Sequence, residues 1–311
     1  MKRRLMIIVS VVVLLGSAVY AVFALNRMGI ISFERMFTPT YPLSVSCGAY
    51  GTAGRLEVRT VCVSIYADTD ETVWDDQKQQ DDMYTKLGDA VEWIEETTSG
   101  YGVETEFLYD WKEDPELYHH VSGVVSDFNY RLDENDGYNK LWNYINNEIP
   151  TEELIAKYDA DNVIYLVFIL TGDFDGILPY ASNGYFDPDF YYDTDFIPTR
   201  YTEHEVTASV IAHEILHLYG AADLYNATSD ESFNYKNNQQ MVDYITANYP
   251  DELMLRTFDH DTDTPFYGKV NGMMSPITAY YVGLTDEIPQ AVLDFGLDLS
   301  TFDPNRIEDT E

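Results

Sequence analysis

The longest uninterrupted run of apolar residues lies at the start of the chain, where LMIIVSVVVLLGSAVYAVFAL covers residues 5–25 without a charge. A helix of this length crosses a hydrocarbon core of about 30 Å. The cations KRR at residues 2–4 precede the run, and such charge stays cytoplasmic. We therefore expect a signal anchor over residues 1–27, with the rest of the chain outside. The alternative is a signal peptide cleaved after Ala21 or Ala24, although its apolar region would usually span only about 7–15 residues.

A helical pattern covers residues 75–98. Its apolar residues recur at intervals of three and four, which puts them on one face of a helix. Ser99 and Gly100 follow and are expected to end the helix. The stripe consists of Met83, Leu87, Val91 and Ile94.

Strand patterns alternate with helical ones in the first half of the chain. Residues 55–66 are rich in β-branched side chains, and residues 103–109 alternate between apolar and polar, so both predict strands. The unbroken apolar run NVIYLVFIL at 162–170 is typical of a central strand covered on both faces. Helices are expected over 138–147 and over 151–158, the second with a capping box. This order predicts a mixed α/β domain with a twisted mixed sheet.

The second half is expected to begin with a loop at 172–198 that is crowded with Asp, Gly, Tyr and Pro and holds a short strand near 177–181. A helix over 203–219 should follow. Residues 28–54 are interpreted as a juxtamembrane spacer and residues 55–300 as one folded domain. An acidic tail is expected over 301–311.

The net charge of the chain limits the kinds of molecule that it is expected to bind. The chain has 54 Asp and Glu residues against 18 Lys and Arg residues, a formal net charge of −36. Such a surface repels phosphate groups, so nucleic acid is not an expected partner. The charge fits a soluble exported body, and it also allows Ca²⁺ binding on the Asp-rich loop at 173–195 or attraction of cationic substrates.

Two histidines stand four residues apart in the segment HEILHLYGAAD, residues 213–223. On a helix His213 and His217 lie on one face, one turn apart, so their ring nitrogens can converge on one zinc ion. Glu214 lies about 100° further round the helix, beside the open coordination position. This is the place of the general base in H-E-x-x-H enzymes.

A catalytic zinc site needs a third protein ligand and one position for water. Gly220 can adopt a positive φ and end the helix, which turns the chain sharply. Asp223 would then reach back toward the same ion. The alternative is that the spacing of the two histidines and the glutamate is a coincidence on an amphipathic helix. Against this, the chain has only six histidines, and the pattern extends through Gly220.

The segment HEILHLYGAAD resembles the extended metzincin pattern HExxHxxGxx(H/D), and its Asp-ended form is similar to snapalysin-type secreted proteases. Metzincins usually end the pattern with His. The resemblance covers residues 213–223 and implies a metzincin-like zincin fold with an active-site helix. It also implies Zn²⁺ held by His213, His217 and Asp223, with Glu214 as the base.

Metzincins place a methionine in a tight turn beneath the metal ligands. The segment PDELML contains Met254, and its ELM resembles the snapalysin version. The alternative is NGMMSP with Met273 and Met274, and simple core filling remains open for each methionine. Tyr280 and Tyr281 are candidates for lining a substrate pocket or for polarising the substrate carbonyl.

Cys47 and Cys62 flank a Gly-rich segment and are candidates for a disulfide, which would suit an exported domain. Together these features predict a membrane-anchored, extracytoplasmic zinc endopeptidase acting on protein or peptide substrates. Two alternatives stay open. One is a non-catalytic surface protein with a structural zinc, and the other is a hydrolase of cell-wall peptides.

Overall fold

The computed structural model describes residues 53–69, 72–125, 136–171, 178–182, 193–201, 204–225, 236–259, 262 and 264–297, which belong to a unit that runs from Leu43 to Glu311. The expected anchor at 5–25 and the acidic tail at 301–311 lie outside these residues. Within the described ranges, no helix has both the length and the apolar character needed to span a membrane.

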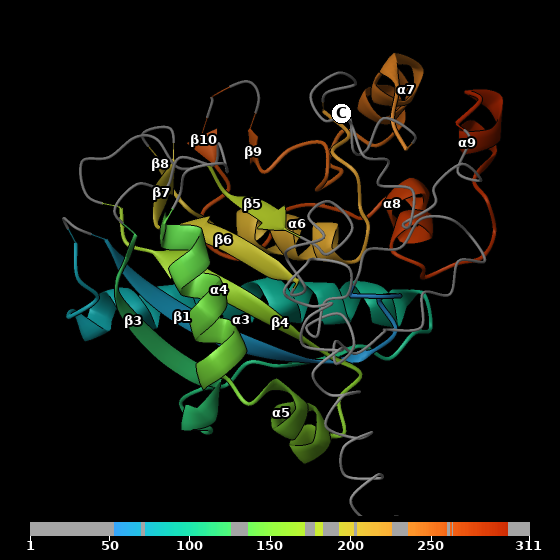
Figure 1. Cartoon of the computed structure of the whole chain (residues 1–311). Helices are drawn as coiled ribbons and strands as arrows, with labels where there is room; N and C mark the ends of the chain where they lie inside the picture. The colour runs from blue at the N-terminus through green and yellow to red at the C-terminus, as the bar shows by residue number, and fades with distance from the viewer. Residues whose placement is uncertain are drawn as a thin grey trace, which may run out of the picture. The chain divides into compact units, whose positions relative to one another are not determined.

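A six-stranded mixed sheet forms the centre of this unit (Figure 1). All of its pairings are parallel except that of the short strand at one edge, which runs antiparallel to its neighbour. At the opposite edge, two strands pair with the same neighbouring strand, one along its first half and the other along its second half. The strands are β1 (Arg59–Thr69), β2 (Glu106–Leu108), β3 (Tyr118–Val125), β4 (Asn162–Ile169), β5 (Tyr180–Ser182) and β6 (Thr194–Pro198), in the order β2/β3–β1–β4–β6–β5.

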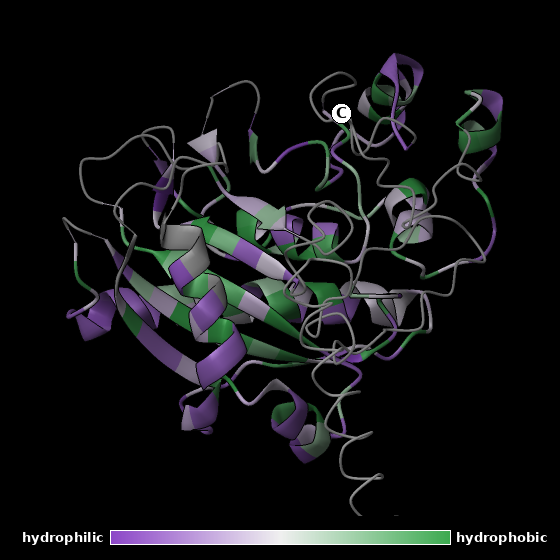
Figure 2. Ribbon diagram, in the orientation of Figure 1, coloured by the Kyte–Doolittle hydropathy of each residue, from purple (hydrophilic) through white to green (hydrophobic). Residues whose placement is uncertain are grey.

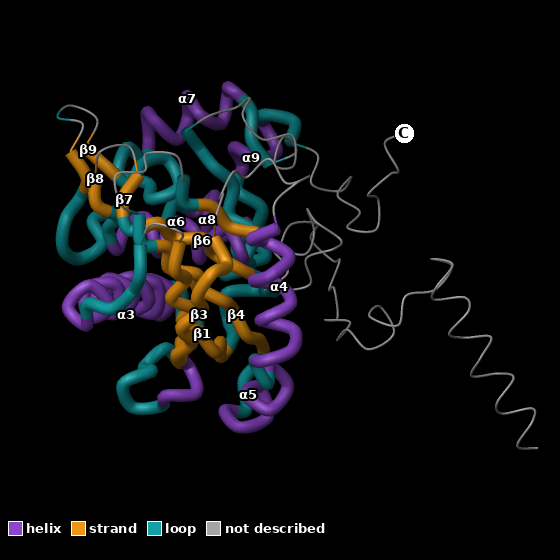
Figure 3. The backbone as a smooth tube through the Cα atoms, turned by 60° about the vertical axis from the view of Figure 1, so that its left-hand side comes forward, coloured by secondary structure: helices purple, strands orange, loops and turns teal. Residues whose placement is uncertain are grey.

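Helices cover both faces of the sheet (Figure 3). Helices α3 (Gln77–Gly100) and α6 (Ala208–Leu218) share one core with the sheet, while α4 (Asp136–Glu148) and α5 (Thr151–Tyr158) share the other. All eight residues of β4 are buried, as expected for a central strand. Figure 2 shows β4 as largely hydrophobic and much of the exposed side of α4 as hydrophilic.

Most of the remaining elements lie after β6 in the chain. Their short lengths mean that side-chain packing, rather than long ladders of backbone hydrogen bonds, holds them in place. They are the hairpin β7 (Arg200–Tyr201) and β8 (His204–Glu205), helix α7 (Gln239–Asn248), the pair β9 (Phe258–Asp259) and β10 (Thr264–Pro265), and helices α8 (Pro276–Tyr281) and α9 (Gln290–Asp294), while a 3-10 turn, η2 (Pro115–Leu117), leads into β3.

The apolar periodicity located the main elements correctly. The four stripe residues of α3 are all buried, and Asp76 caps the helix by accepting a hydrogen bond from the Lys78 amide. The expected strands at 55–66 and 103–109 are present but shifted or shortened, as β1 and β2. The expected capping box at Thr151 is wrong, because Pro150 occupies the cap position and no side chain caps α5.

Three features differ from the expectation. β6 lies inside the segment 172–198, for which a loop was expected. Its sequence TDFIP does not predict a strand, because Asp and Pro are depleted in strands. All five of its residues are nevertheless buried. β3 was not expected from YHHVSGVV. The helix expected at 203–219 begins only at Ala208, because His204 belongs to the β7–β8 hairpin.

Helix α6 is buried on every side, which is unusual for a helix that carries two histidines and a glutamate. At its end, Gly220 has φ +99°, the Gly220 amide donates to the His217 carbonyl, and the Ala221 amide donates to the Leu216 carbonyl. This pair of bonds is a Schellman motif. It turns the chain sharply after the second histidine, so that the next residues return over the same face of the helix.

We predict that Gly220→Ala lowers the free energy of unfolding by about 1–2 kcal/mol, since an L-residue in the left-handed region is disfavoured by that amount. Urea unfolding followed by circular dichroism measures the loss. Gly100→Ala is the control, because Gly100 ends α3 without a positive φ and a Cβ there meets nothing within 4 Å. A Gly220→Ala variant as stable as the wild type would contradict the assigned turn.

Candidate metal centre

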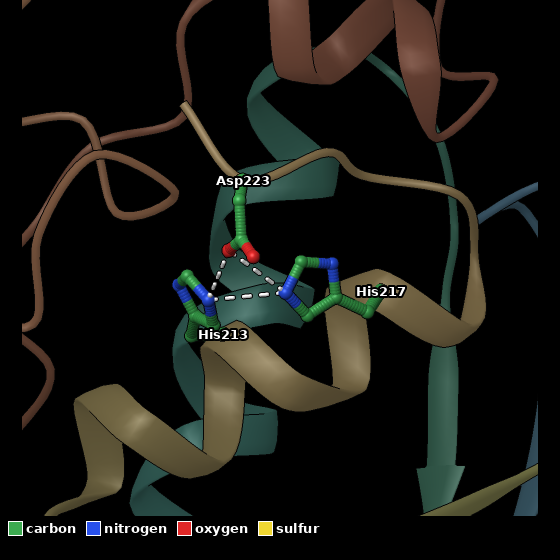
Figure 4. A group of neighbouring side chains, drawn as sticks. All are labelled: His213, His217 and Asp223. Atoms are coloured by element: carbon green, nitrogen blue, oxygen red, sulfur yellow. Dashed lines mark hydrogen bonds and ion pairs between the residues drawn. The ribbon is translucent and has the colours of Figure 1, made fainter. Parts of the chain in front are cut away.

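Three potential ligand atoms converge at the end of α6 (Figure 4). The Nε2 atoms of His213 and His217 are 3.1 Å apart, and Asp223 Oδ1 lies 3.1 Å from the first and 3.2 Å from the second. Donors about 2.0–2.1 Å from a tetrahedral zinc ion stand about 3.3 Å from each other. The three atoms therefore have nearly the spacing of one face of a zinc tetrahedron.

Backbone carbonyls fix the proton positions on both histidines. Nδ1 of His213 lies 3.1 Å from the Leu253 carbonyl, and Nδ1 of His217 lies 2.8 Å from the Ala221 carbonyl. Because a carbonyl oxygen only accepts, each Nδ1 carries the hydrogen and each neutral ring presents a lone pair at Nε2. Two lone pairs and a carboxylate oxygen then face one another, an arrangement that a cation between them would stabilise.

The pKa values of His217 and Asp223 also indicate that a positive charge is favoured at this position. Burial alone would lower the pKa of His217, but the charge of Asp223 outweighs it and raises this pKa to about 9 in the metal-free protein. Burial would likewise raise the pKa of Asp223, yet the two imidazoles hold it well below its ordinary value. Without a metal, a proton on His217 supplies a positive charge.

Glu214 lies beside these ligands. The side chain is buried, and the nearby Ala181 amide in β5 favours its charged form. Burial raises its pKa, and the two histidines reduce that rise. A carboxylate with an elevated pKa next to a metal position suits proton transfer near neutral pH.

The segment that contains Met254 lies directly against the ligands. Leu253 provides the carbonyl that orients His213, and the Met254 carbonyl accepts from the Leu224 amide, next to Asp223. Met254 itself is fully buried. The segment around Met273 pairs with this one, because the Leu253 amide donates to the Met273 carbonyl.

Glu252 anchors the same turn. Its buried carboxylate accepts hydrogen bonds from the Met254 amide, the Ser275 amide and the Thr278 hydroxyl. Met274 is buried beside this network, whereas Met273 is 39% exposed. The two candidate methionine segments are therefore neighbours. Among the contacts that the structure defines, the segment 252–254 is the one that bonds to a histidine.

Sequence reasoning did not identify Tyr225. Its ring lies nearly parallel to that of His213, with centroids 6.4 Å apart, and 52% of the residue is exposed. The only sequence signal was its place two residues after Asp223.

Tyr280 and Tyr281, expected at a substrate pocket, are almost completely buried in α8. The Tyr281 hydroxyl donates a hydrogen bond to the Lys236 carbonyl over 2.5 Å, so this side chain links α8 to the segment at Lys236. Cys62 is a buried free thiol on β1, while Cys47 lies outside the described residues, so their pairing stays a prediction. The loop considered for Ca²⁺ is also largely outside them.

A scan against protein-family models gives no match to this chain, and a search of curated proteins gives none either. The interpretation of the site therefore depends on its own geometry.

We predict that zinc affinity rises about tenfold per pH unit between pH 6 and pH 8, because zinc would have to displace the proton that His217 holds below its pKa of about 9. Calorimetric titration in buffers of different ionisation enthalpy should show about one proton released per zinc at pH 7.

His204→Ala should keep the same slope, since His204 lies on the β7–β8 hairpin outside the ligand set. Affinity that does not change with pH would contradict the assigned proton.

Proposed function

We propose that the chain is a zinc-dependent endopeptidase of metzincin type. The observation that carries the proposal is the convergence of His213, His217 and Asp223. Among the residues that the structure describes, these are the only three His, Cys, Asp or Glu side chains grouped closely enough to share an ion. Three protein ligands leave one position of a tetrahedron for water or substrate, as in catalytic sites, whereas structural zinc sites use four.

The donor set suits zinc. Two imidazoles with lone pairs fixed at Nε2 and one carboxylate are ligands that zinc accepts in catalytic sites. When bound there, zinc would act as a Lewis acid that polarises a carbonyl and makes a water molecule more acidic. The Leu253 and Ala221 carbonyls hold the rings in place for this task, without touching the substrate.

Glu214 would move the proton. Its carboxylate takes a proton from the attacking water as the new C–O bond forms at the scissile carbonyl carbon. The same proton then goes to the amide nitrogen, and the C–N bond breaks to release an amine and a carboxylate. The nearby Ala181 amide would favour the charged form of this carboxylate, which accepts the proton.

The edge of the sheet offers a place for an extended peptide. Among the described residues, β5 is the outermost strand on this side of the sheet, and its Ala181 lies near Glu214. A substrate that pairs with β5 through main-chain hydrogen bonds would pass its scissile bond over the ligand set. Tyr225 would then lie on the solvent side of that bond.

The resemblance of HEILHLYGAAD to the snapalysin-type signature supports this choice. The apolar run at 5–25 supports a membrane-anchored enzyme that works outside the cell. A cell-wall peptide hydrolase would use the same chemistry on another substrate, and profiling of cleaved peptides separates the two. A non-catalytic zinc protein is disfavoured by the three-ligand set.

We predict that Glu214→Gln lowers kcat by about 10²–10⁴-fold, because the amide cannot accept the proton. Zinc content should stay at one ion per chain. The measurement is hydrolysis of an unstructured protein such as casein, with metal analysis of the same sample.

Glu205→Gln is the matched control, since this exposed glutamate lies just before α6 and contacts none of the ligands. A Glu214→Gln variant with wild-type activity would sink the proposed mechanism.

A further inference from the structure

A buried lysine lies behind the turn that carries the third ligand. Lys236 is 1% exposed, and its Nζ donates to the Gly220 carbonyl. The same Nζ lies 5.2 Å from the centre of the Tyr281 ring. Lysine is rarely buried this completely, so its place calls for a physical reason.

The next residue holds the other end of the turn. The Asn237 side-chain amide donates to the Asp223 carbonyl over 2.5 Å. Two adjacent residues thus bind the first and last carbonyls of the 220–223 segment. The Tyr281 hydroxyl bonds the Lys236 carbonyl, so helix α8 holds the pair in turn.

The chemistry of both contacts suits the end of a helix. Carbonyls at and beyond the helix C-terminus lack partners within the helix, and the helix dipole makes this end negative. A lysine Nζ satisfies such a carbonyl and complements the dipole. Burial lowers the pKa of Lys236 to about 7, but both the ammonium and the amine keep an N–H to donate.

We propose that Lys236 and Asn237 are positioning residues that hold the Gly220–Asp223 turn, and thereby keep the Asp223 carboxylate at ligand distance from the two histidines. Neither residue is in the ligand group, so both act through the turn. The inference rests on the proposed metal site and adds to it how the third ligand is held. A purely structural role would alter stability without a specific link to Asp223.

The test is a double-mutant cycle on zinc affinity, measured by competition with a chromophoric chelator. Lys236→Met keeps most of the side-chain volume and removes the donor. We expect it to weaken zinc binding about 10–100-fold, as is usual for groups that orient metal ligands. In an Asp223→Ala background, the same substitution should add little, because the ligand that it positions is gone.

Lys269→Met is the control, since this exposed lysine pairs only with Glu92 among its defined contacts, and it should leave affinity unchanged. Cobalt substitution adds a spectroscopic measure, because a displaced carboxylate changes the intensity of the visible bands. Asn237→Ala gives the same comparison through the other contact, and serves if Lys236→Met does not fold.

Equal zinc affinity in the wild type and in both variants would overturn this inference alone. An equal loss in the presence and absence of Asp223 would overturn it as well, since the effect would then be on the fold as a whole. A wild-type chain that binds no zinc would instead overturn the proposed function.

Discussion

The structure depends on one electrostatic constraint, which is that two histidine lone pairs and a carboxylate are held face to face inside a buried helix end. The carbonyls of Leu253 and Ala221 hold the hydrogens on the far sides of the rings. With donor atoms 3.1–3.2 Å apart, the site is repulsive unless a cation occupies its centre. Under the proposed function, a metal would compete with the proton of His217 for this place.

This constraint explains why so much of the C-terminal half surrounds one short helix. The Schellman turn at Gly220 returns Asp223 to the ligands, and the 252–254 turn brings a carbonyl to His213. Glu252 fastens that turn to the start of α8, and α8 reaches Lys236 through Tyr281. His213 is thus oriented by a segment 40 positions away in sequence, whereas His217 and Asp223 are positioned by the turn that directly follows α6.

Local patterns predicted the parts of the site that a single helix determines. The i, i+4 spacing placed His213 and His217 together, and the glycine three residues later marked the turn that returns Asp223. The apolar run of β4 and the stripe of α3 were equally readable, because burial on both faces or on one face leaves a clear period.

The rest depended on tertiary contacts that leave no local trace. β6 was hidden because its Asp195 and Pro198 do not look like strand residues, although its neighbours bury them. Lys236 lies in the polar stretch NYKNNQQ, which suggests a solvated loop. The Leu253 carbonyl belongs to the backbone, and every residue has one. The identity of residue 253 therefore could not predict the hydrogen bond to His213, 40 positions away.

Anomalous diffraction at the zinc absorption edge, from crystals of the zinc-loaded protein, tests the central claim most directly. We predict one peak bound by Nε2 of His213, Nε2 of His217 and a carboxylate oxygen of Asp223, with the fourth position held by solvent. A peak with four protein ligands, or a metal bound elsewhere with these three side chains free of it, would contradict the account.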